Sequence, residues 1–315
     1  MRPKVSVLII ARNEEHNIPK LFKSLKRLRY PRDRYEIVLI DDKSTDNTGK
    51  VAKSFGARVV RNENWAGRGR ARNIALKNAK YDHVAWIDAD CEIVNENWLN
   101  DMIPYLKGKV VGVAGTHIFP SHGNAIQKAI WFLPGMHMET DKPKEFSRAP
   151  TTSSLFLKKP LIDVGMFNEN LVTGEDLEIC MRLRKKGYKF MLIPSAKIII
   201  GYRKTVFRYM EQQIEYGIEG AKILAKYHGR GKILLSIPAL ILLLAAAYLF
   251  PLLIPIYLSS LFLLHFTLLG PEIAIRTWIK ALKSGGANVC LANFYLTFLR
   301  NISIICGFLT GVLRA

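Results

Sequence analysis

The chain has 315 residues and a formal net charge of +20, from 46 lysines and arginines against 26 aspartates and glutamates. This balance favours anionic partners: nucleic acid, phosphorylated small molecules or acidic lipid headgroups. The four cysteines form no CxxC pair, which fits reduced thiols in a cytosolic domain.

Residues 1–115 alternate between strand patterns and helix patterns. Strands are predicted at residues 5–10, 36–40, 57–60, 83–87 and 110–115. Helices are predicted over residues 18–25, around 51–55, and over 69–79 and 98–106, from apolar residues at helical spacing. Near-continuous apolar strands alternating with helices predict an α/β fold, with a mostly parallel sheet covered by helices on both faces.

The C-terminal part of the chain has a different composition. Residues 233–271 contain no Asp, Glu, Lys or Arg, and this stretch is about twice the length that a membrane helix needs. We therefore expect a cytosolic domain over residues 1–230 and a helical membrane domain over 231–315. The membrane domain is predicted to contain two helices within 233–270, an interfacial helix at 271–284 and a third segment at 288–313. With such an anchor, lipid and nucleotide phosphates are favoured as partners over nucleic acid.

Polar clusters follow three of the predicted strands. They are ARNEE at residues 11–15, DDKSTD at 41–46 and DADCE at 88–92. Ligands bind at the carboxyl ends of the strands in open α/β sheets. Three such clusters on one edge predict a binding site there.

The DADCE cluster is the candidate metal site. Three carboxylates within five positions repel one another unless a cation lies among them. Mg²⁺ or Mn²⁺ fits, because such ions use one or two carboxylates together with substrate phosphates and water. Asp88, Asp90 and Glu92 are the candidate ligands. The alternative is a strand that runs into a solvated turn.

Two other segments have both a functional and a structural interpretation. In DDKSTDNT, Asp42 is placed to accept an N–H of a nucleobase or ribose hydroxyls, whereas Ser44 or Asp46 is placed to cap the next helix. In GRGRARN, at residues 67–73, glycines and arginines are placed to bind a phosphate at a helix start. The structural alternative for GRGRARN is a basic, solvated helix start.

The segment TGED at residues 173–176 begins another predicted helix. Thr173 and Asp176 have the spacing of a capping box, and Gly187 is placed to end the helix. Asp176 at this helix start is also well placed as a general base.

Together these segments resemble the family 2 glycosyltransferases, which have the GT-A fold. The matching motifs stand in family order over most of residues 4–190. The resemblance implies a nucleotide-sugar donor, UDP- or GDP-linked, and transfer with inversion at the anomeric carbon. It implies a nucleoside pocket at Ala11, Arg12, Glu14 and Asp42, and donor contacts from Arg68, Arg72, Asp88 and Ala89. It further implies a DXD metal motif at Asp88 and Asp90, and Asp176 as the base.

Two departures from the family pattern limit what is expected. The QxxRW motif of polymer synthases is absent from the region around Gln212 and Gln213, which argues against processive synthesis. Many relatives have a histidine near the end of the domain, where this chain has Tyr202.

A base is needed for a hydroxyl acceptor and not for a phosphate, so we expect a metal-dependent transfer to a hydroxyl of a membrane lipid or a lipid-linked saccharide. The alternatives are a polyprenyl-phosphate glycosyltransferase and a catalytically inactive membrane partner subunit. Trp131 and Phe132 are expected at the membrane interface.

Overall fold

The computed structural model describes residues 2–64, 67–133, 138, 140–228, 296, 299–300 and 303–311. The chain divides into two compact units. One combines residues 1–118 and 138–201, and the other combines residues 119–137 and 202–315. This division differs from the boundary expected at residue 230. Residues 206–228 form one helix that packs against residues 303–311, and they therefore group with the C-terminal part of the chain.

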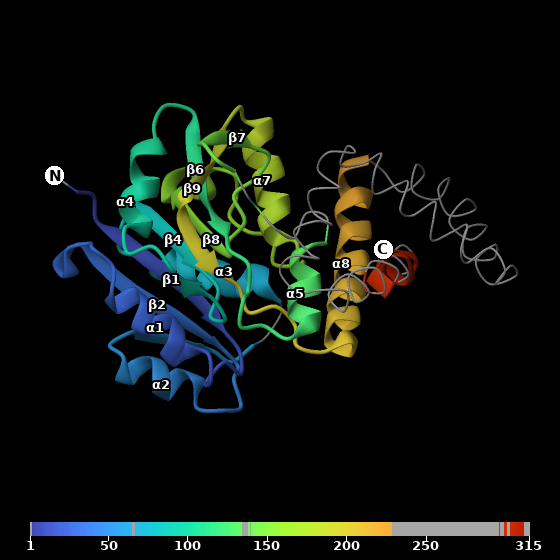
Figure 1. Ribbon diagram of the computed structural model, residues 1–315. Coiled ribbons are helices and arrows are strands. Elements are labelled where there is room, and N and C mark those ends of the chain that lie inside the picture. The colour runs from blue at the N-terminus through green and yellow to red at the C-terminus, as the bar shows by residue number, and fades with distance from the viewer. Residues whose placement is uncertain are drawn as a thin grey trace, which may run out of the picture. The chain divides into compact units, whose positions relative to one another are not determined.

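The first unit alternates strands and helices along the chain (Figure 1). Its strands are β1 (Val5–Ala11), β2 (Tyr35–Asp42), β3 (Arg58–Asn62), β4 (His83–Ile87), β5 (Glu92–Ile93), β6 (Val110–His117), β7 (Lys144–Phe146), β8 (Ser153–Leu157) and β9 (Lys189–Ile199). Its helices are α1 (Ile18–Lys26), α2 (Thr48–Ser54), α3 (Arg68–Asn78), α4 (Trp98–Met102), α6 (Lys158–Asp163) and α7 (Glu175–Lys185), with short 3-10 turns at Arg32–Arg34 and Ile103–Tyr105. The strands and helices predicted over residues 1–115 are confirmed.

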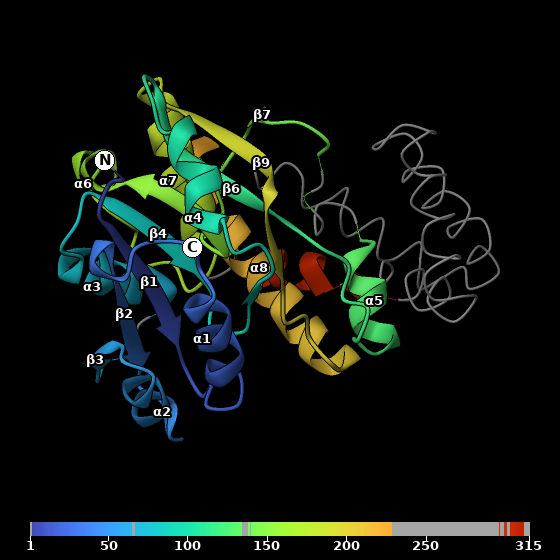
Figure 2. The ribbon, with the colours of Figure 1, turned by 60° about the vertical axis from the view of Figure 1, so that its left-hand side comes forward.

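The described strands form one mixed sheet in the order β3-β2-β1-β4-β8-β6-β9-β5, with β7 paired to β9. Figure 2 shows β3, β2, β1 and β4 side by side in this sheet. Strands β3, β2, β1 and β4 are parallel, as is the pair β6 and β9. The expectation of a mostly parallel sheet is wrong for the other half. Strand β8 runs antiparallel between β4 and β6, and β5 and β7 run antiparallel to β9.

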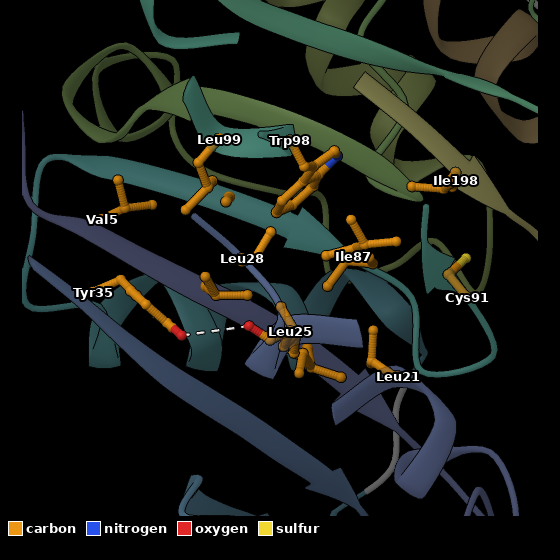
Figure 3. Packing of buried hydrophobic residues seen from close by; sticks show 14 of the residues in the cluster. Val5, Leu21, Leu25, Leu28, Tyr35, Ile87, Cys91, Trp98, Leu99 and Ile198 are labelled. Atoms are coloured by element: carbon orange, nitrogen blue, oxygen red, sulfur yellow. Dashed lines mark hydrogen bonds between the residues drawn. The ribbon is translucent and has the colours of Figure 1, made fainter. Parts of the chain in front are cut away.

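Helices cover both faces of this sheet, as predicted. Along β1 the side chains of Val5, Val7 and Ile9 face one layer and that of Leu8 faces the other, as the two-residue period of a strand requires. One core layer includes residues of α1, α2 and α4, and part of it is shown in Figure 3. The other includes residues of α3, α6 and α7. Apolar side chains are therefore needed on both faces of the central strands.

The second unit contains α5 (Ala125–Trp131) and α8 (Val206–His228). A capping box begins α5: the side chain of Asn124 accepts the Gln127 N–H at 2.9 Å, and the Gln127 side chain accepts the Asn124 N–H at 3.1 Å. A β-carbon at Gly217 of α8 would lie 2.2 Å from the carbonyl oxygen of Ile304. Glycine there lets α8 approach residues 303–311 backbone to backbone.

Trp131 and Phe132 do not have the exposed position expected for a membrane-interface pair. Each is 2% exposed. Their rings pack edge to face with centroids 4.9 Å apart, and both rings contact Phe119 at 5.5 Å. The two residues and Phe119 form an aromatic cluster inside the second unit. Packing the three rings together removes their apolar surface from water.

The expected membrane segments fall almost entirely outside the described residues. Those at 233–270 and 271–284 lie wholly outside them, and the segment at 288–313 is described only at residues 296, 299–300 and 303–311. Among the residues that the structure describes, no helix combines the length and the apolar character needed to cross a bilayer.

Candidate active site

The polar clusters meet at one edge of the parallel half of the sheet. Ala11 ends β1 and pairs with Asp41, Asp42 ends β2, and Asp88 follows β4 directly. Because β1 pairs in parallel with both β2 and β4, the carboxyl ends of the three strands lie at the same edge. The prediction that these clusters share one edge is confirmed.

The turn from β4 to β5 explains the spacing of Asp88 and Asp90. Ala89 and Cys91 are buried, at 3% and 1% exposure, and they anchor the turn in the core. The Cys91 N–H donates to the carbonyl oxygen of Asp88 at 3.1 Å and closes the turn. Asp88 and Asp90 are only partly buried, and the Asp88 side chain is 35% exposed. Two partly exposed carboxylates fit Mg²⁺ or Mn²⁺, which completes its shell with water and phosphate oxygens.

Burial also makes Cys91 chemically inert. Loss of solvent raises the pKa of this thiol well above its usual range, and the negative charges of Asp90 and Asp88 raise it further. The thiolate, which is the form that binds metals, is therefore disfavoured at neutral pH. The metal-binding character of the turn rests on its aspartates.

Glu92 lies in a different set of contacts from the two aspartates. Its carboxylate is 3.0 Å from the Lys20 Nζ and 3.5 Å from an Arg27 guanidinium nitrogen. Within the described residues, no group of three or more His, Cys, Asp or Glu side chains is arranged to hold a metal ion. Because Lys20 and Arg27 already bind the Glu92 carboxylate, the candidate metal set consists of Asp88 and Asp90.

A Glu92→Gln variant tests this assignment. Because its carboxylate is occupied by Lys20 and Arg27, we expect donor binding to need the same Mn²⁺ concentration as in the wild type. The loss of a partly exposed ion pair should cost less than about 1 kcal/mol of stability. Calorimetric titration of UDP and GDP at several Mn²⁺ concentrations measures the first effect. A weaker metal response in this variant would return Glu92 to the metal set.

The end of β9 lies against the turn that holds Asp90. A β-carbon at Gly201 would lie 2.8 Å from the backbone oxygen of Asp90 and 2.9 Å from its β-carbon. Such distances leave no space for a side chain. Backbone therefore fills the position next to Asp90, and Gly201 has no side chain that could bind a metal ion there.

The loops that follow β1 and β2 are tied together by side chains. Asn13 Oδ1 accepts the Thr45 N–H at 2.8 Å, and Glu15 Oε2 accepts the Asn47 N–H at 2.8 Å. The Glu14 N–H donates to the Thr48 hydroxyl at 2.7 Å. Asn13 has a φ of 57°, a conformation that asparagine tolerates better than most residues. These bonds make a rigid edge for the predicted nucleoside pocket.

The adjacent carboxylates of Asp41 and Asp42 have different environments. Asp41 is bound by Arg61 at 2.8 Å and by the Ser44 N–H at 3.0 Å, so its role is structural. Asp42 is 3% exposed, and one of its oxygens accepts a hydrogen bond from Asn62 at 2.6 Å. Burial raises the pKa of Asp42, and the Asn62 hydrogen bond and the charge of Arg12 oppose this rise.

The N-cap of α2 is Asn47, and not Ser44 or Asp46 as the capping alternative expected. Asp46 still binds the start of this helix, because its carboxylate accepts the backbone N–H of Thr48, the first residue of α2, at 2.9 Å. The Ser44 hydroxyl instead accepts the Asn13 N–H at 3.1 Å. Hydrogen bonds and an ion pair within the protein therefore account for Asp41, Ser44 and Asp46. Asp42 remains the candidate for binding the nucleobase.

The two glycines of GRGRARN face protein backbone. A β-carbon at Gly67, where φ is 103°, would lie 2.8 Å from the Leu171 carbonyl oxygen, and one at Gly69 would lie 2.2 Å from the Asn168 carbonyl oxygen. The glycines let the start of α3 pack against residues 168–172. This packing explains why glycine is needed at both positions, whether or not a phosphate binds there.

The arginines of α3 join α3 to the segment around α7. Arg68 donates to the Thr173 hydroxyl at 3.1 Å. Arg72 is 5% exposed, its Nε donates to Glu175 Oε1 at 2.6 Å, and its Nη2 lies 3.5 Å from Asp88 Oδ1. Its guanidinium carbon lies 5.4 Å from the centroid of the Trp86 ring. Arg72 was predicted to contact the donor, and the structure shows it bound to two carboxylates of the protein.

Glu175 is the residue of this site that the sequence did not reveal. It is 2% exposed and lies beside the expected base Asp176. Burial raises the pKa of Glu175, and the charge of Arg72 opposes this rise. The Asp88–Arg72–Glu175 contacts link the metal turn to the start of α7.

Removing the charge of Arg72 should destabilise the fold. An Arg72→Met variant leaves Glu175 buried without its cation, and we expect a loss of about 3–5 kcal/mol in the free energy of unfolding. Urea denaturation of the full chain measures this loss. Lys159→Met is the matched control, because its pair with Asp163 is exposed and should contribute little to stability. Equal stability of the two variants would contradict a buried ion pair.

Asp176 lies in the first turn of α7 and is partly exposed. The predicted capping box is wrong: the N-cap is Gly174, which has a φ of 75° and no side chain, and the Thr173 hydroxyl accepts from Arg68 instead. Gly187, at a φ of 82°, follows the C-cap residue and ends the helix as predicted. Of the Glu–Asp pair, only Asp176 is accessible to a substrate.

Comparison with known proteins identifies the class of this domain. The glycosyl transferase family 2 model matches residues 6–165, about half of the chain. The chain therefore belongs to glycosyl transferase family 2.

Two curated relatives and one solved structure are informative. Glycosyltransferase AglE of Haloferax volcanii is 26% identical over 59% of this chain and 63% of its own length. A beta-monoglucosyldiacylglycerol synthase of Nostoc is 30% identical over 58% of this chain and 41% of its own length. The mannosyltransferase PcManGT of Pyrobaculum calidifontis, solved with GDP-Man and Mn²⁺, has a TM-score of 0.60 at 18% identity, over 100% of this chain and 87% of its own.

These comparisons differ in what they establish. The matched region spans less than two thirds of the length of either curated relative. At 18% identity, the likeness to the mannosyltransferase establishes the fold, which is that of a GT-A glycosyltransferase domain. The fold implied by the sequence motifs is confirmed.

Proposed function

We propose that this protein transfers a sugar, with inversion, from a nucleotide-sugar donor to a hydroxyl group of a membrane lipid or lipid-linked saccharide, and that the reaction needs Mn²⁺ or Mg²⁺. The observation that supports this most is the Asp88–Arg72–Glu175 set of contacts, which ties the candidate metal turn to α7, the helix that carries Asp176 in its first turn. The family membership and the Mn²⁺ complex of the structural neighbour agree with it.

In the proposed reaction Asp88 and Asp90 would hold the ion, which would supply positive charge to the diphosphate. Asp42 accepts a hydrogen bond from the nucleobase. Asp176 takes the proton of the acceptor hydroxyl as its oxygen bonds to the anomeric carbon. The bond from that carbon to the diphosphate oxygen breaks at the same time, and the nucleoside diphosphate leaves. Attack on the face opposite the leaving group inverts the anomeric centre.

The lipid acceptor is supported by two separate observations. The Nostoc relative is named as a synthase of a glucosyl lipid. Residues 233–271 have the length and composition of membrane-spanning sequence, and this supports our proposal that the reaction takes place at the cytosolic face of a cell membrane. An accessible carboxylate base favours a hydroxyl acceptor over a phosphate, which is already an anion at neutral pH.

A transfer assay tests the proposal. The full chain in membranes is incubated with Mn²⁺, labelled UDP- and GDP-sugars and a lipid extract, and the lipid phase is then treated with mild acid. We expect a label that survives the acid on the lipid, or one that the acid releases as part of an oligosaccharide. A label released as the free monosaccharide would replace the hydroxyl acceptor with a polyprenyl phosphate. No label in any lipid would contradict a lipid acceptor.

A further inference from the structure

The ends of β2 and β3 hold a side-chain pair that bears on the choice of nucleotide. Asp42 and Asn62 are register partners in the parallel strands, and both are almost fully buried, at 3% and 4% exposure. Asn62 Nδ2 donates to Asp42 Oδ1 at 2.6 Å, and Asn62 Oδ1 accepts the Asn64 N–H at 3.3 Å. Because the amide oxygen is used by Asn64, the amide nitrogen must face Asp42.

This arrangement leaves Asp42 with one carboxylate oxygen that is not already bonded to Asn62. The charges of Arg12 and Arg70 favour the ionised form of this carboxylate, and the neighbouring charge of Asp41 opposes it. A ligand edge that enters here meets one carboxylate oxygen that Asn62 does not occupy. The complementary edge has one donor.

Uracil has such an edge, because its N3–H lies between two carbonyl oxygens. Guanine presents a carbonyl oxygen followed by two neighbouring donors, N1–H and the exocyclic amino group, and needs two acceptors side by side. With Asn62 on Oδ1, the second guanine donor would have to share that oxygen with the Asn62 amide, and its hydrogen bond would be weaker than one to an unoccupied oxygen.

We propose that the nucleotide site selects uridine over guanosine and that Asn62 is the specificity-determining residue, because it engages one oxygen of Asp42. This inference rests on the proposed function, in which Asp42 contacts the nucleobase. The donor would then be a UDP-sugar. The GDP-Man of the structural neighbour is a ligand of that protein, whose likeness to this chain is one of fold.

Calorimetric titration of the full chain with UDP and with GDP, in the presence of Mn²⁺, tests the inference directly. We expect UDP to bind at least about tenfold more tightly, which is the effect of one buried donor with a weakened hydrogen bond. N3-methyl-UDP, which lacks the central donor, should lose a similar factor. Equal or tighter binding of GDP would overturn the base preference and leave the proposed function standing. Binding of neither nucleotide would overturn both.

Two variants assign the preference to Asn62. Asn62→Ala frees the Asp42 oxygen, so the ratio of UDP to GDP affinity should fall at least about threefold, mainly through tighter GDP binding. Asn64→Ala keeps the backbone N–H that holds Asn62 and should retain the wild-type ratio. A wild-type ratio in a folded Asn62→Ala protein would overturn the role of Asn62. If that variant does not fold, the comparison of UDP, GDP and N3-methyl-UDP on the wild type decides the base preference.

Discussion

An Asp176→Asn variant should bind the nucleotide sugar with unchanged affinity and transfer the sugar about 10²- to 10⁴-fold more slowly, the usual contribution of a positioned base. The physical reason is that asparagine has nearly the shape of aspartate and cannot take the hydroxyl proton. Glu175 cannot replace it, because that carboxylate is buried and bound to Arg72 at 2.6 Å. Single-turnover transfer and donor titration on the same preparation separate the two effects.

The matched control for this variant is Asp163→Asn, which also removes one carboxylate but at an exposed pair with Lys159. Its transfer rate should equal that of the wild type. If Asp176→Asn transferred at the wild-type rate, Asp176 would have no catalytic role. The proposal of a hydroxyl acceptor would then lose its main support.

An Asp90→Asn variant should weaken Mn²⁺-dependent donor binding by at least about tenfold, or about 1.4 kcal/mol. One of two anionic ligands is lost, and the amide oxygen that replaces it is a weaker ligand for a hard divalent ion. Titration of UDP and GDP with and without Mn²⁺ shows whether the loss of affinity is confined to the Mn²⁺-dependent part of nucleotide binding. Glu92→Gln is the matched control two residues away. Identical Mn²⁺ dependence in Asp90→Asn and wild type would exclude Asp90 as a ligand.

Local sequence signals were enough for the parallel half of the fold. Strands such as residues 5–10 and 83–87 are almost entirely apolar because both faces are covered, and the polar clusters that follow them mark the functional edge. The DXD turn was also predictable, since burial of the alternate residues Ala89 and Cys91 turns Asp88 and Asp90 the other way. In each case the signal lies within about ten residues of chain.

The features that the sequence missed depend on distant partners. Strand β8 lies antiparallel between β4 and β6, and nothing within residues 153–157 specifies those neighbours. Glu92 resembled a third metal ligand until α1 brought Lys20 and Arg27 to it. Thr173 has the spacing of a capping residue, but the N-cap of α7 is Gly174 in the left-handed conformation. The Thr173 hydroxyl accepts a hydrogen bond from Arg68 instead.

Asn62 could have been found from the strand pattern, and Glu175 from its position next to Asp176. A third strand extended by two residues places Asn62 beside Asp42 in parallel register, and this is what the structure has. A glutamate next to the expected base is a natural candidate partner for a buried arginine. The sequence alone did not show which arginine, because Arg68, Arg70 and Arg72 all lie at the start of one helix.

The metal requirement is the central claim, and transfer by chelator-treated protein tests it most directly. Protein stripped with EDTA and exchanged into metal-free buffer should lose sugar transfer, and Mn²⁺ or Mg²⁺ should restore it. The restored rate should saturate with ion concentration, and Asp90→Asn should need more ion to reach saturation. Full-rate transfer by the stripped protein, with no response to added Mn²⁺ or Mg²⁺, would contradict a catalytic role for Asp88 and Asp90 as metal ligands.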